Sequence, residues 1–232
     1  EDTLSLHDAL PISSVDKAWL EGFSCGLFAL ADFHNCVLVG GDTTQGPLNI
    51  CITVFGEVPQ GAALLRSGAQ AGDDIYVSGG IDAKGNSQYV GQARLALEVF
   101  RGNLSIPQNE LEIARVRMER PTPRVALGVA LRGIATSAVD ISDGLLGDLG
   151  HILKLSNVGA MVQTDWITGS AEFALAGGDD YELLFTAPQS QRNAVQAASD
   201  KASTTVTRIG EIQSAQSLRL LDAMGLPLAN TF

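Results

Sequence analysis

The chain has 232 residues, a hydrophobic fraction of 45% and a formal net charge of −11 at pH 7. This length allows one large domain or two small ones with a substantial core. The excess of acids argues against a broad nucleic-acid surface, which needs clustered Lys and Arg. No run approaches the roughly 18 apolar residues of a membrane span, and no signal peptide opens the chain. We therefore expect a cytoplasmic protein without nucleic-acid or membrane partners.

Residues 1–13 show neither helical nor strand periodicity, and the chain does not begin with Met. We interpret them as a disordered or foreign leader in front of a fragment. A capping box, with Ser13 as N-cap and Asp16 three residues later, predicts a helix that runs to about Phe33. The stripe of this helix that we expect in the core comprises Trp19, Phe23, Leu27 and Leu30.

Two apolar stretches after this helix predict strands, at residues 35–39 and 48–58, with a turn between them. With the helix they form a piece, residues 14–65, that is too small to close a core alone. We expect this piece to be the remnant of a larger N-terminal domain. Residues 66–232 are expected to form a complete C-terminal domain.

The remainder of the chain alternates between strand and helix patterns. The strands are predicted at 74–78, 137–141, 159–162, 181–186 and 205–209. The helices are predicted at 87–100, 109–117, 125–132 and 145–153, with one more before the last strand. Such alternation indicates an α/β or α+β chain, in which a mixed sheet is packed with helices.

Four turns that carry carboxylates adjoin these strands. They are Gly40-Gly41-Asp42-Thr43-Thr44, Gly72-Asp73-Asp74, Asp140-Ile141-Ser142-Asp143-Gly144 and Gly177-Gly178-Asp179-Asp180. Carboxylates next to glycine at strand ends can converge on a hard cation such as Mg²⁺. A site of this kind can hold a nucleoside triphosphate through metal ions. The chain has no G-x-x-x-x-G-K-[ST] sequence, which excludes a Walker-type phosphate loop.

Asp140 and Asp143 lie at a strand-to-helix turn, where Ser142 or Asp143 could simply cap the helix. The functional alternative is that the helix N-terminus attracts a phosphate. The two carboxylates would then hold Mg²⁺ against that phosphate, and the Ser142 hydroxyl would donate to it. The residues alone leave both interpretations open.

The other candidates have similar alternatives. Asp42 lies either in a plain turn or in a metal site whose glycines let the backbone approach a phosphate. Arg66 is either a solvated surface cation or a group that neutralises a triphosphate. Asp179 and Asp180 form either a turn or a ligand site.

In this order, these residues resemble the thiamine-monophosphate kinase family, which belongs to the superfamily of aminoimidazole ribonucleotide synthetase and selenophosphate synthetase. The likeness covers residues 14 to about 220. Besides the turns at Asp42, Asp140 and Asp179, it is carried by Val15-Asp16-Lys17-Ala18-Trp19-Leu20, Arg66-Ser67-Gly68-Ala69, Gly72-Asp73-Asp74-Ile75-Tyr76-Val77-Ser78-Gly79 and Arg120-Pro121-Thr122-Pro123-Arg124.

The resemblance implies an AIR-synthetase-like fold of two domains, with the N-terminal domain truncated. It also implies direct transfer of the γ-phosphate of ATP onto thiamine monophosphate, which gives thiamine diphosphate. Several Mg²⁺ ions take part, but no general base is expected, because the nucleophile is already a phosphate oxyanion. A homodimer paired through the N-terminal sheets is implied as well, with residues 48–58 as the candidate interface.

The resemblance carries over residue by residue. Asp42, Asp140 and Asp143 are the implied Mg²⁺ ligands, and Asp179, where the family usually has Glu, is the implied substrate contact. The implied ATP contacts are Gly41, Asp42, Arg66 and Ser142.

Two alternatives stay open. The first is an ATP-dependent synthetase or kinase of the same superfamily with a different acceptor. The second is a non-catalytic nucleotide-binding scaffold. It arises because the N-terminal part of the family, with its further Mg²⁺-binding acids, has no counterpart here, so the chain could be an inactive fragment.

Overall fold

The chain divides into two compact units, Glu1–Glu57 and Val58–Phe232. The computed structural model describes residues 16–44, 46–81, 87–88, 90–164, 171–222 and 224–228. The division falls a few residues before the boundary expected near residue 65. The leader predicted at residues 1–13 lies outside the described residues, and the assignment of the first unit to a larger domain stays a prediction.

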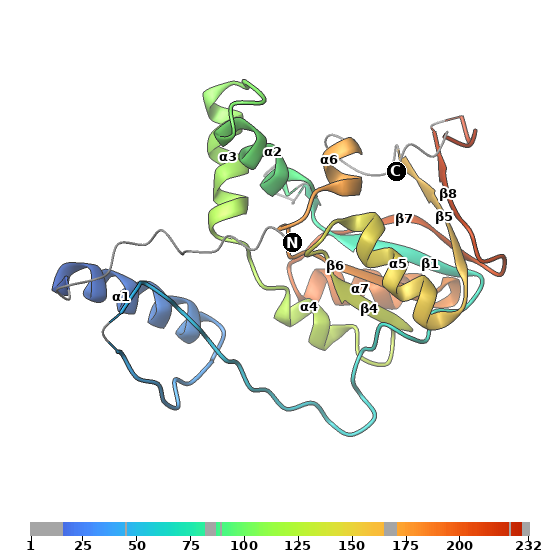
Figure 1. Cartoon of the computed structure of the whole chain (residues 1–232). Helices are drawn as coiled ribbons and strands as arrows, with labels where there is room; N and C mark the ends of the chain where they lie inside the picture. Colours follow the sequence, from blue (N-terminus) through green and yellow to red (C-terminus); the bar gives the residue numbers. More distant parts are fainter. Residues whose placement is uncertain are drawn as a thin grey trace. The chain divides into compact units, whose positions relative to one another are not determined.

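The first unit contains helix α1, Lys17–Phe33 (Figure 1). Its N-cap is Asp16, whose carboxylate accepts the N–H groups of Ala18 and Trp19. The predicted cap, Ser13, lies outside the described residues. Asp and Ser are comparable caps, so the local pattern did not choose between them. The predicted core stripe was wrong, because no residue of α1 is buried.

Neither strand predicted after α1 is present in the part of this unit that the structure describes. A strand needs a ladder of backbone hydrogen bonds to a neighbouring strand, and the described residues around these segments supply none. Their apolar side chains are instead exposed, and they include Val37, Leu38, Val39, Ile52, Val54 and Phe55.

The second unit is built on a six-stranded sheet in the order β4-β6-β1-β7-β5-β8. The strands are β1 (Asp73–Ser78), β4 (Ser137–Asp140), β5 (Gly159–Gln163), β6 (Leu183–Pro188), β7 (Val206–Gln213) and β8 (Leu218–Leu221). Neighbours are antiparallel except for β5 and β8, which are parallel. The predicted mixed sheet is therefore confirmed, although the edge strand β8 was not predicted.

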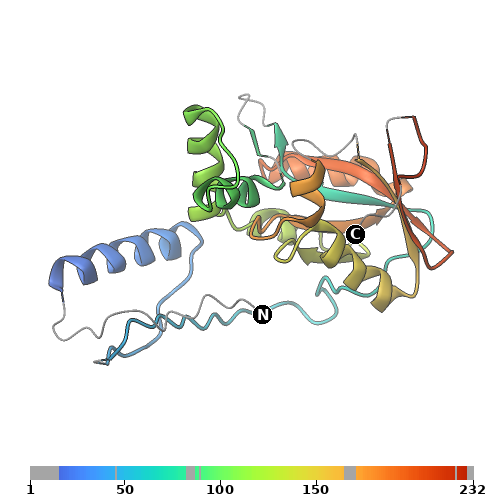
Figure 2. The same cartoon turned by 45° about the horizontal axis from the view of Figure 1, so that its top comes forward.

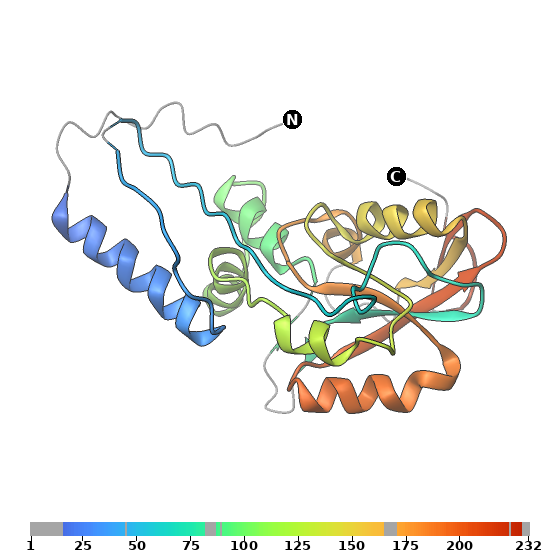
Figure 3. The same ribbon diagram turned by 90° about the horizontal axis from the view of Figure 1, so that it is seen from below.

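Helices cover both faces of this sheet (Figure 3). Over one face lie α5 (Leu145–Ser156) and α6 (Ala171–Ala176). Over the other lie α4 (Val125–Ala130) and α7 (Arg192–Lys201), the latter entered through the 3-10 turn η3 (Gln189–Gln191). Helices α2 (Gln92–Phe100) and α3 (Gln108–Glu119) pack on each other at one end of the sheet (Figure 2).

Side chains of β1 contribute to the hydrophobic clusters on both faces of the sheet, since successive side chains of a strand point to opposite faces. Ile75 and Val77 belong to the cluster that includes the buried side of α5. Tyr76 belongs to the cluster beneath α4 and α7, where its ring stacks on Phe185 at a centroid distance of 5.2 Å.

The helix predicted over residues 87–100 begins only at Gln92. Ser87–Gln88 forms strand β3, which pairs with β2 (Gly80–Ile81). Gly91 then has a φ of +91°, a left-handed conformation that interrupts any helix before it. In the described part of the chain, no helix has the length and apolar character needed to cross a bilayer.

Candidate functional site

The turn after edge strand β4 lies between a strand and a helix, as predicted. Asp140 ends β4 and α5 begins at Leu145. Asp140 and Asp143 are exposed, whereas Ser142 is half-buried. Gly144 has a φ of +118°, and a Cβ there would lie 3.1 Å from the carbonyl carbon of Ala176. Only glycine fits this position without strain.

A buried carboxylate from α5 holds this turn. Oδ2 of Asp148 accepts the N–H of Ser142 at 3.0 Å and the N–H of Asp143 at 3.1 Å. Asp148 is 1% exposed. Sequence reasoning missed this residue, and the available signal was an acid in the first turn of the helix, where carboxylates are favoured. The protein's own carboxylate therefore occupies these two N–H groups, which precede the helix.

The loop before β6, residues 177–182, is joined to this turn through the backbone. The N–H of Asp179 donates to the carbonyl of Ser142 at 3.0 Å, and the N–H of Tyr181 donates to Ile141 at 2.9 Å. A Cβ on Gly178 would lie 2.3 Å from the Ser142 oxygen, so glycine permits this approach. The two acidic turns predicted from sequence thus form one surface, which we call the paired turns (residues 140–144 and 177–182).

Side chains alternate along the second of the paired turns. Asp179 and Tyr181 are exposed and have left-handed φ values of +67° and +52°. Asp180 and Glu182 are 2% and 0% exposed. Left-handed backbone is unfavourable for residues other than glycine and is frequent at functional sites. The loop therefore presents one pair of side chains to solvent and anchors itself with the other pair.

Asp180 is one anchor. It caps α2, because its carboxylate accepts the N–H of Gly91 at 2.6 Å and the N–H of Ala93 at 3.3 Å. Burial raises the pKa of Asp180 to about 6, against the opposing effect of these two hydrogen bonds. Asp180 is thus part of the framework rather than a ligand of the exposed surface.

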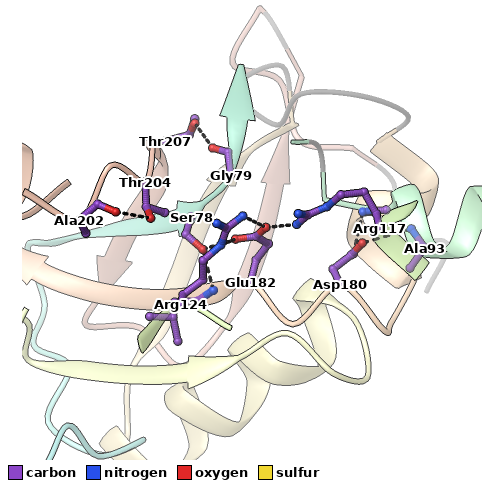
Figure 4. Close-up of polar contacts among 12 residues, drawn as sticks. Ser78, Gly79, Ala93, Arg117, Arg124, Asp180, Glu182, Ala202, Thr204 and Thr207 are labelled. Carbon is purple, nitrogen blue, oxygen red and sulfur yellow. Dashed lines mark hydrogen bonds and ion pairs between the residues drawn. The ribbon is translucent and has the colours of Figure 1, made fainter. Parts of the chain in front are cut away.

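Glu182 is the other anchor (Figure 4). Arg124 donates to both of its oxygens, through Nε at 2.7 Å and Nη2 at 2.6 Å. Arg117 and the Ser78 hydroxyl donate to the same carboxylate. Both arginine side chains are nearly buried, with 11% and 7% exposure. Glu182 therefore ties the loop to α3, to the start of α4 and to the end of β1.

The exposed carboxylates of the paired turns affect the ionisation of the Tyr181 hydroxyl. The pKa of Tyr181 is raised by the partial burial of its side chain and by the negative charges of Asp179, Asp140 and Asp143. Its hydroxyl donates to Oδ1 of Asp179 at 3.5 Å. The paired turns thus carry three of the acids singled out from sequence, namely Asp140, Asp143 and Asp179.

Oxygen donors of this kind fit a hard cation such as Mg²⁺. Among the residues that the structure describes, no group of three or more His, Cys, Asp or Glu side chains is arranged to hold a metal ion alone. Mg²⁺ does not require one, because it commonly uses one or two carboxylates together with waters and substrate phosphates. The assignment of Asp140 and Asp143 as Mg²⁺ ligands stays a prediction.

Arg66 lies on a segment that runs alongside edge strand β4 and is hydrogen-bonded to it. The carbonyl of the preceding Leu65 accepts the N–H of Ala138 at 2.8 Å, and the Ser156 hydroxyl accepts the N–H of Gly68 at 3.1 Å. The Arg66 side chain is exposed.

Gly41 and Asp42 belong to the first unit, where both are exposed. Gly41 has a φ of +147°. Their roles, like those of Arg66, Ser142 and Asp179 toward ATP or substrate, stay predictions.

Residues 70–222 match the family described as AIR synthase related protein, C-terminal domain. The chain is 40% identical to thiamine-monophosphate kinase of Salmonella typhimurium over 219 residues, which cover 89% of this chain and 65% of that relative. It is 41% identical to the Escherichia coli enzyme of the same name over 224 residues, 88% of this chain and 64% of the relative. The chain thus spans slightly less than two thirds of the length of these curated relatives.

The fold is similar to that of solved structures. The crystal structure of thiamine-monophosphate kinase from Stenotrophomonas maltophilia K279a has a TM-score of 0.77 and 40% identity, covering 91% of this chain and 69% of that one. A structure described as AaThiL complexed with AMPPCP and TMP has a TM-score of 0.68 and 23% identity, covering 91% and 67%. The second likeness concerns the fold alone.

Proposed function

The chain belongs to the AIR synthase related family and, within it, to the thiamine-monophosphate kinases, and on this premise we propose that the whole protein phosphorylates thiamine monophosphate. ATP is the phosphoryl donor, the γ-phosphate is transferred directly, and thiamine diphosphate is the product. The relatives that match at 40% and 41% identity carry this name.

The observation that carries the proposal is the pairing of the two acidic turns. Hydrogen bonds of 3.0 and 2.9 Å join the backbone of Asp179 and Tyr181 to the turn that carries Asp140 and Asp143. A predicted metal-binding turn and a predicted substrate-binding loop therefore share one surface. Such a surface can position two phosphate-bearing substrates for in-line transfer, which is the main requirement of this reaction.

We assign the roles as follows. Asp140 and Asp143 of the second unit would hold Mg²⁺, which when bound would neutralise phosphate charge. Asp42 of the first unit is proposed as a further Mg²⁺ ligand. The Ser142 hydroxyl and the Arg66 guanidinium would contact the oxygens of ATP, with the Gly41 backbone close to the phosphates. Asp179 would contact thiamine monophosphate. No side chain needs to remove a proton, because the attacking oxygen is already an anion.

The test is calorimetric titration of the purified chain with Mg·AMPPCP, with and without thiamine monophosphate, followed by a transfer assay that quantifies thiamine diphosphate. We expect Asp143→Asn to lower transfer by about 100-fold, because weaker Mg²⁺ binding removes charge neutralisation at the reacting phosphate. Glu112→Gln on the exposed surface of α3 should leave it unchanged. A folded chain that binds both ligands and yet forms no thiamine diphosphate would overturn the proposal.

We also propose that the protein acts in the cytoplasm as a homodimer. The exposed apolar side chains of residues 36–58, such as Val39 at 86% and Phe55 at 84%, support pairing of these segments with a second copy. Light scattering after size exclusion should give twice the mass of the chain, and Val54→Lys should reduce it. A monomer at all concentrations would exclude this arrangement.

A further inference from the structure

We propose that Asp148 is a positioning residue that holds the turn before α5 and makes its surface bind a cation rather than an anion. This inference rests on the proposed function, because it concerns how the paired turns receive Mg²⁺ and phosphate. Asp148 touches no ligand itself and acts through the peptide groups of Ser142 and Asp143.

The geometry is specific. Asp148 Oδ2 accepts both N–H groups, at 3.0 and 3.1 Å, and the side chain is 1% exposed. The N–H of Asp148 in turn donates to the carbonyl of Gly144 at 3.0 Å, within the first turn of α5. A carboxylate with two N–H donors at a helix N-terminus is stabilised both by these hydrogen bonds and by the helix dipole.

The consequence concerns charge. Open N–H groups in the turn that leads into a helix would attract phosphate directly. Here the protein's own carboxylate occupies the two N–H groups before the helix. The groups left facing solvent in this turn are the carboxylates of Asp140 and Asp143, which repel a bare phosphate and attract a cation. Phosphate binding at this turn should therefore depend on Mg²⁺.

The hydrogen bond from Ser142 to Asp148 also affects the loop that carries Asp179, the predicted substrate contact. The residue Ser142 is held at both of its backbone polar groups, since its N–H donates to Asp148 and its carbonyl accepts the N–H of Asp179. Releasing the Asp148 end frees the turn that positions Asp143 and the loop that positions Asp179. Asp148 thus couples the predicted metal ligands to the predicted substrate contact.

Two variants separate hydrogen bonding from charge. Asp148→Asn keeps an oxygen that can accept both N–H groups, whereas Asp148→Ala keeps none. Asp200→Asn, at an exposed position of α7, is the matched control. The first readout is amide hydrogen exchange of Ser142 and Asp143, followed by NMR without nucleotide. The second is the Mg²⁺ concentration at half-saturation of AMPPCP binding, measured by calorimetry together with binding of inorganic phosphate without Mg²⁺.

We expect Asp148→Ala to accelerate exchange at both amides by tenfold or more, to raise the Mg²⁺ requirement by about 10-fold to 100-fold and to bind phosphate measurably without Mg²⁺. Asp148→Asn should resemble the wild type and the control in exchange. Wild-type exchange and Mg²⁺ dependence in Asp148→Ala would overturn the inference. If the alanine variant does not fold, fast exchange at both amides in a folded Asp148→Asn would overturn it equally.

The exchange readout needs no nucleotide, so it remains decisive if the chain does not bind AMPPCP. In that case slow exchange in Asp148→Asn together with fast exchange in Asp148→Ala supports the positioning role, whatever the transfer assay shows about the proposed function.

Discussion

Two buried carboxylates, Asp74 and Glu182, are held in the same way at opposite ends of the central strands. Both are 0% exposed, and each accepts from two arginines and one hydroxyl. Asp74 binds Arg192 through Nε at 2.6 Å and Arg208 at 3.2 Å. The partners differ in burial, since these two arginines are 47% and 37% exposed while those of Glu182 are 11% and 7% exposed.

The difference in the burial of the arginines shows how a carboxylate bound by two arginines and a hydroxyl can serve two purposes. Asp74 joins β1 to α7 and β7, and in the sheet it pairs with Ala187 near the end of β6. Glu182 precedes β6 and follows directly on the exposed Tyr181 of the paired turns. The Asp74 group therefore supports the fold with partners that water can reach. The Glu182 group supports the site with partners that water barely reaches, so its loss should cost more.

The largest expected effect is that of Glu182→Ala. It removes the carboxylate that both Arg117 and Arg124 bind, which should lower the free energy of unfolding by about 3–5 kcal/mol. Urea denaturation followed by circular dichroism measures this. The exposed Glu112→Ala should stay within about 0.5 kcal/mol of the wild type. A loss below about 1 kcal/mol for Glu182→Ala would remove the contrast between the two groups.

A smaller effect is expected for Asp74→Ala. Because Arg192 and Arg208 can be hydrated in its absence, the loss should be about 2–3 kcal/mol, typical of hydrogen bonds to a charged group. Binding of Mg·AMPPCP should not change. An equal loss of stability and of nucleotide binding would show that this group also supports the site.

Low pH should reduce the stabilisation that the ion pairs of Asp74 with Arg192 and Arg208 give to the wild type. Burial by itself would raise the pKa of Asp74, but hydrogen bonds and charges from Arg192 and Arg208 lower it below its ordinary value. The stabilisation is therefore complete above the unfolded-state pKa, near 4, and is lost as the pH falls through the lower folded-state value. Thermal unfolding between pH 5 and pH 2 should show a shallower acid dependence in Asp74→Ala than in the wild type.

Gly178→Ala disturbs the paired turns, which Glu182 anchors, without removing an ion pair. The new Cβ would lie 2.3 Å from the Ser142 oxygen, so the paired turns must separate, at about 1–3 kcal/mol. Gly147→Ala in α5 meets nothing within 4 Å and should raise stability by up to about 1 kcal/mol. Differential scanning calorimetry of both variants checks this. Equal melting temperatures for the two would contradict the close approach.

The last prediction concerns the pH dependence of stability that comes from the cap on α2. Asp180 has a folded-state pKa of about 6, raised by burial. Between roughly pH 4 and pH 6 the folded state holds a proton that the unfolded state has lost, so this residue makes stability fall as the pH rises, by at most about 1.4 kcal/mol per pH unit. Asp180→Asn should remove this slope. An unchanged pH profile in the variant would assign the slope to another group.

Local pattern was a sound guide where an element draws its partners from its own unit. The strand predicted at residues 74–78 is confirmed as β1, and the helix predicted at 109–117 is confirmed as α3, Gln108–Glu119. It failed at residues 35–39 and 48–58, where the apolar residues suit a strand but the described chain offers no hydrogen-bonding neighbour. A strand forms only when a second segment supplies the backbone hydrogen bonds, and the sequence of the first segment does not show whether that partner is present.

The sequence alone determined the chemistry of the two acidic turns, their position between strand and helix, the alternating α/β pattern and the family. The residue pattern by itself did not distinguish Asp179 from Asp180, which only the family resemblance did. It also did not reveal Asp148 and Glu182 as anchors, because sequence alone does not show which of several acids is buried. Only the tertiary structure decided which carboxylates face water. Burial of a carboxylate depends on N–H and guanidinium donors that distant elements bring to it, as Gly91 does for Asp180 and Arg124 does for Glu182.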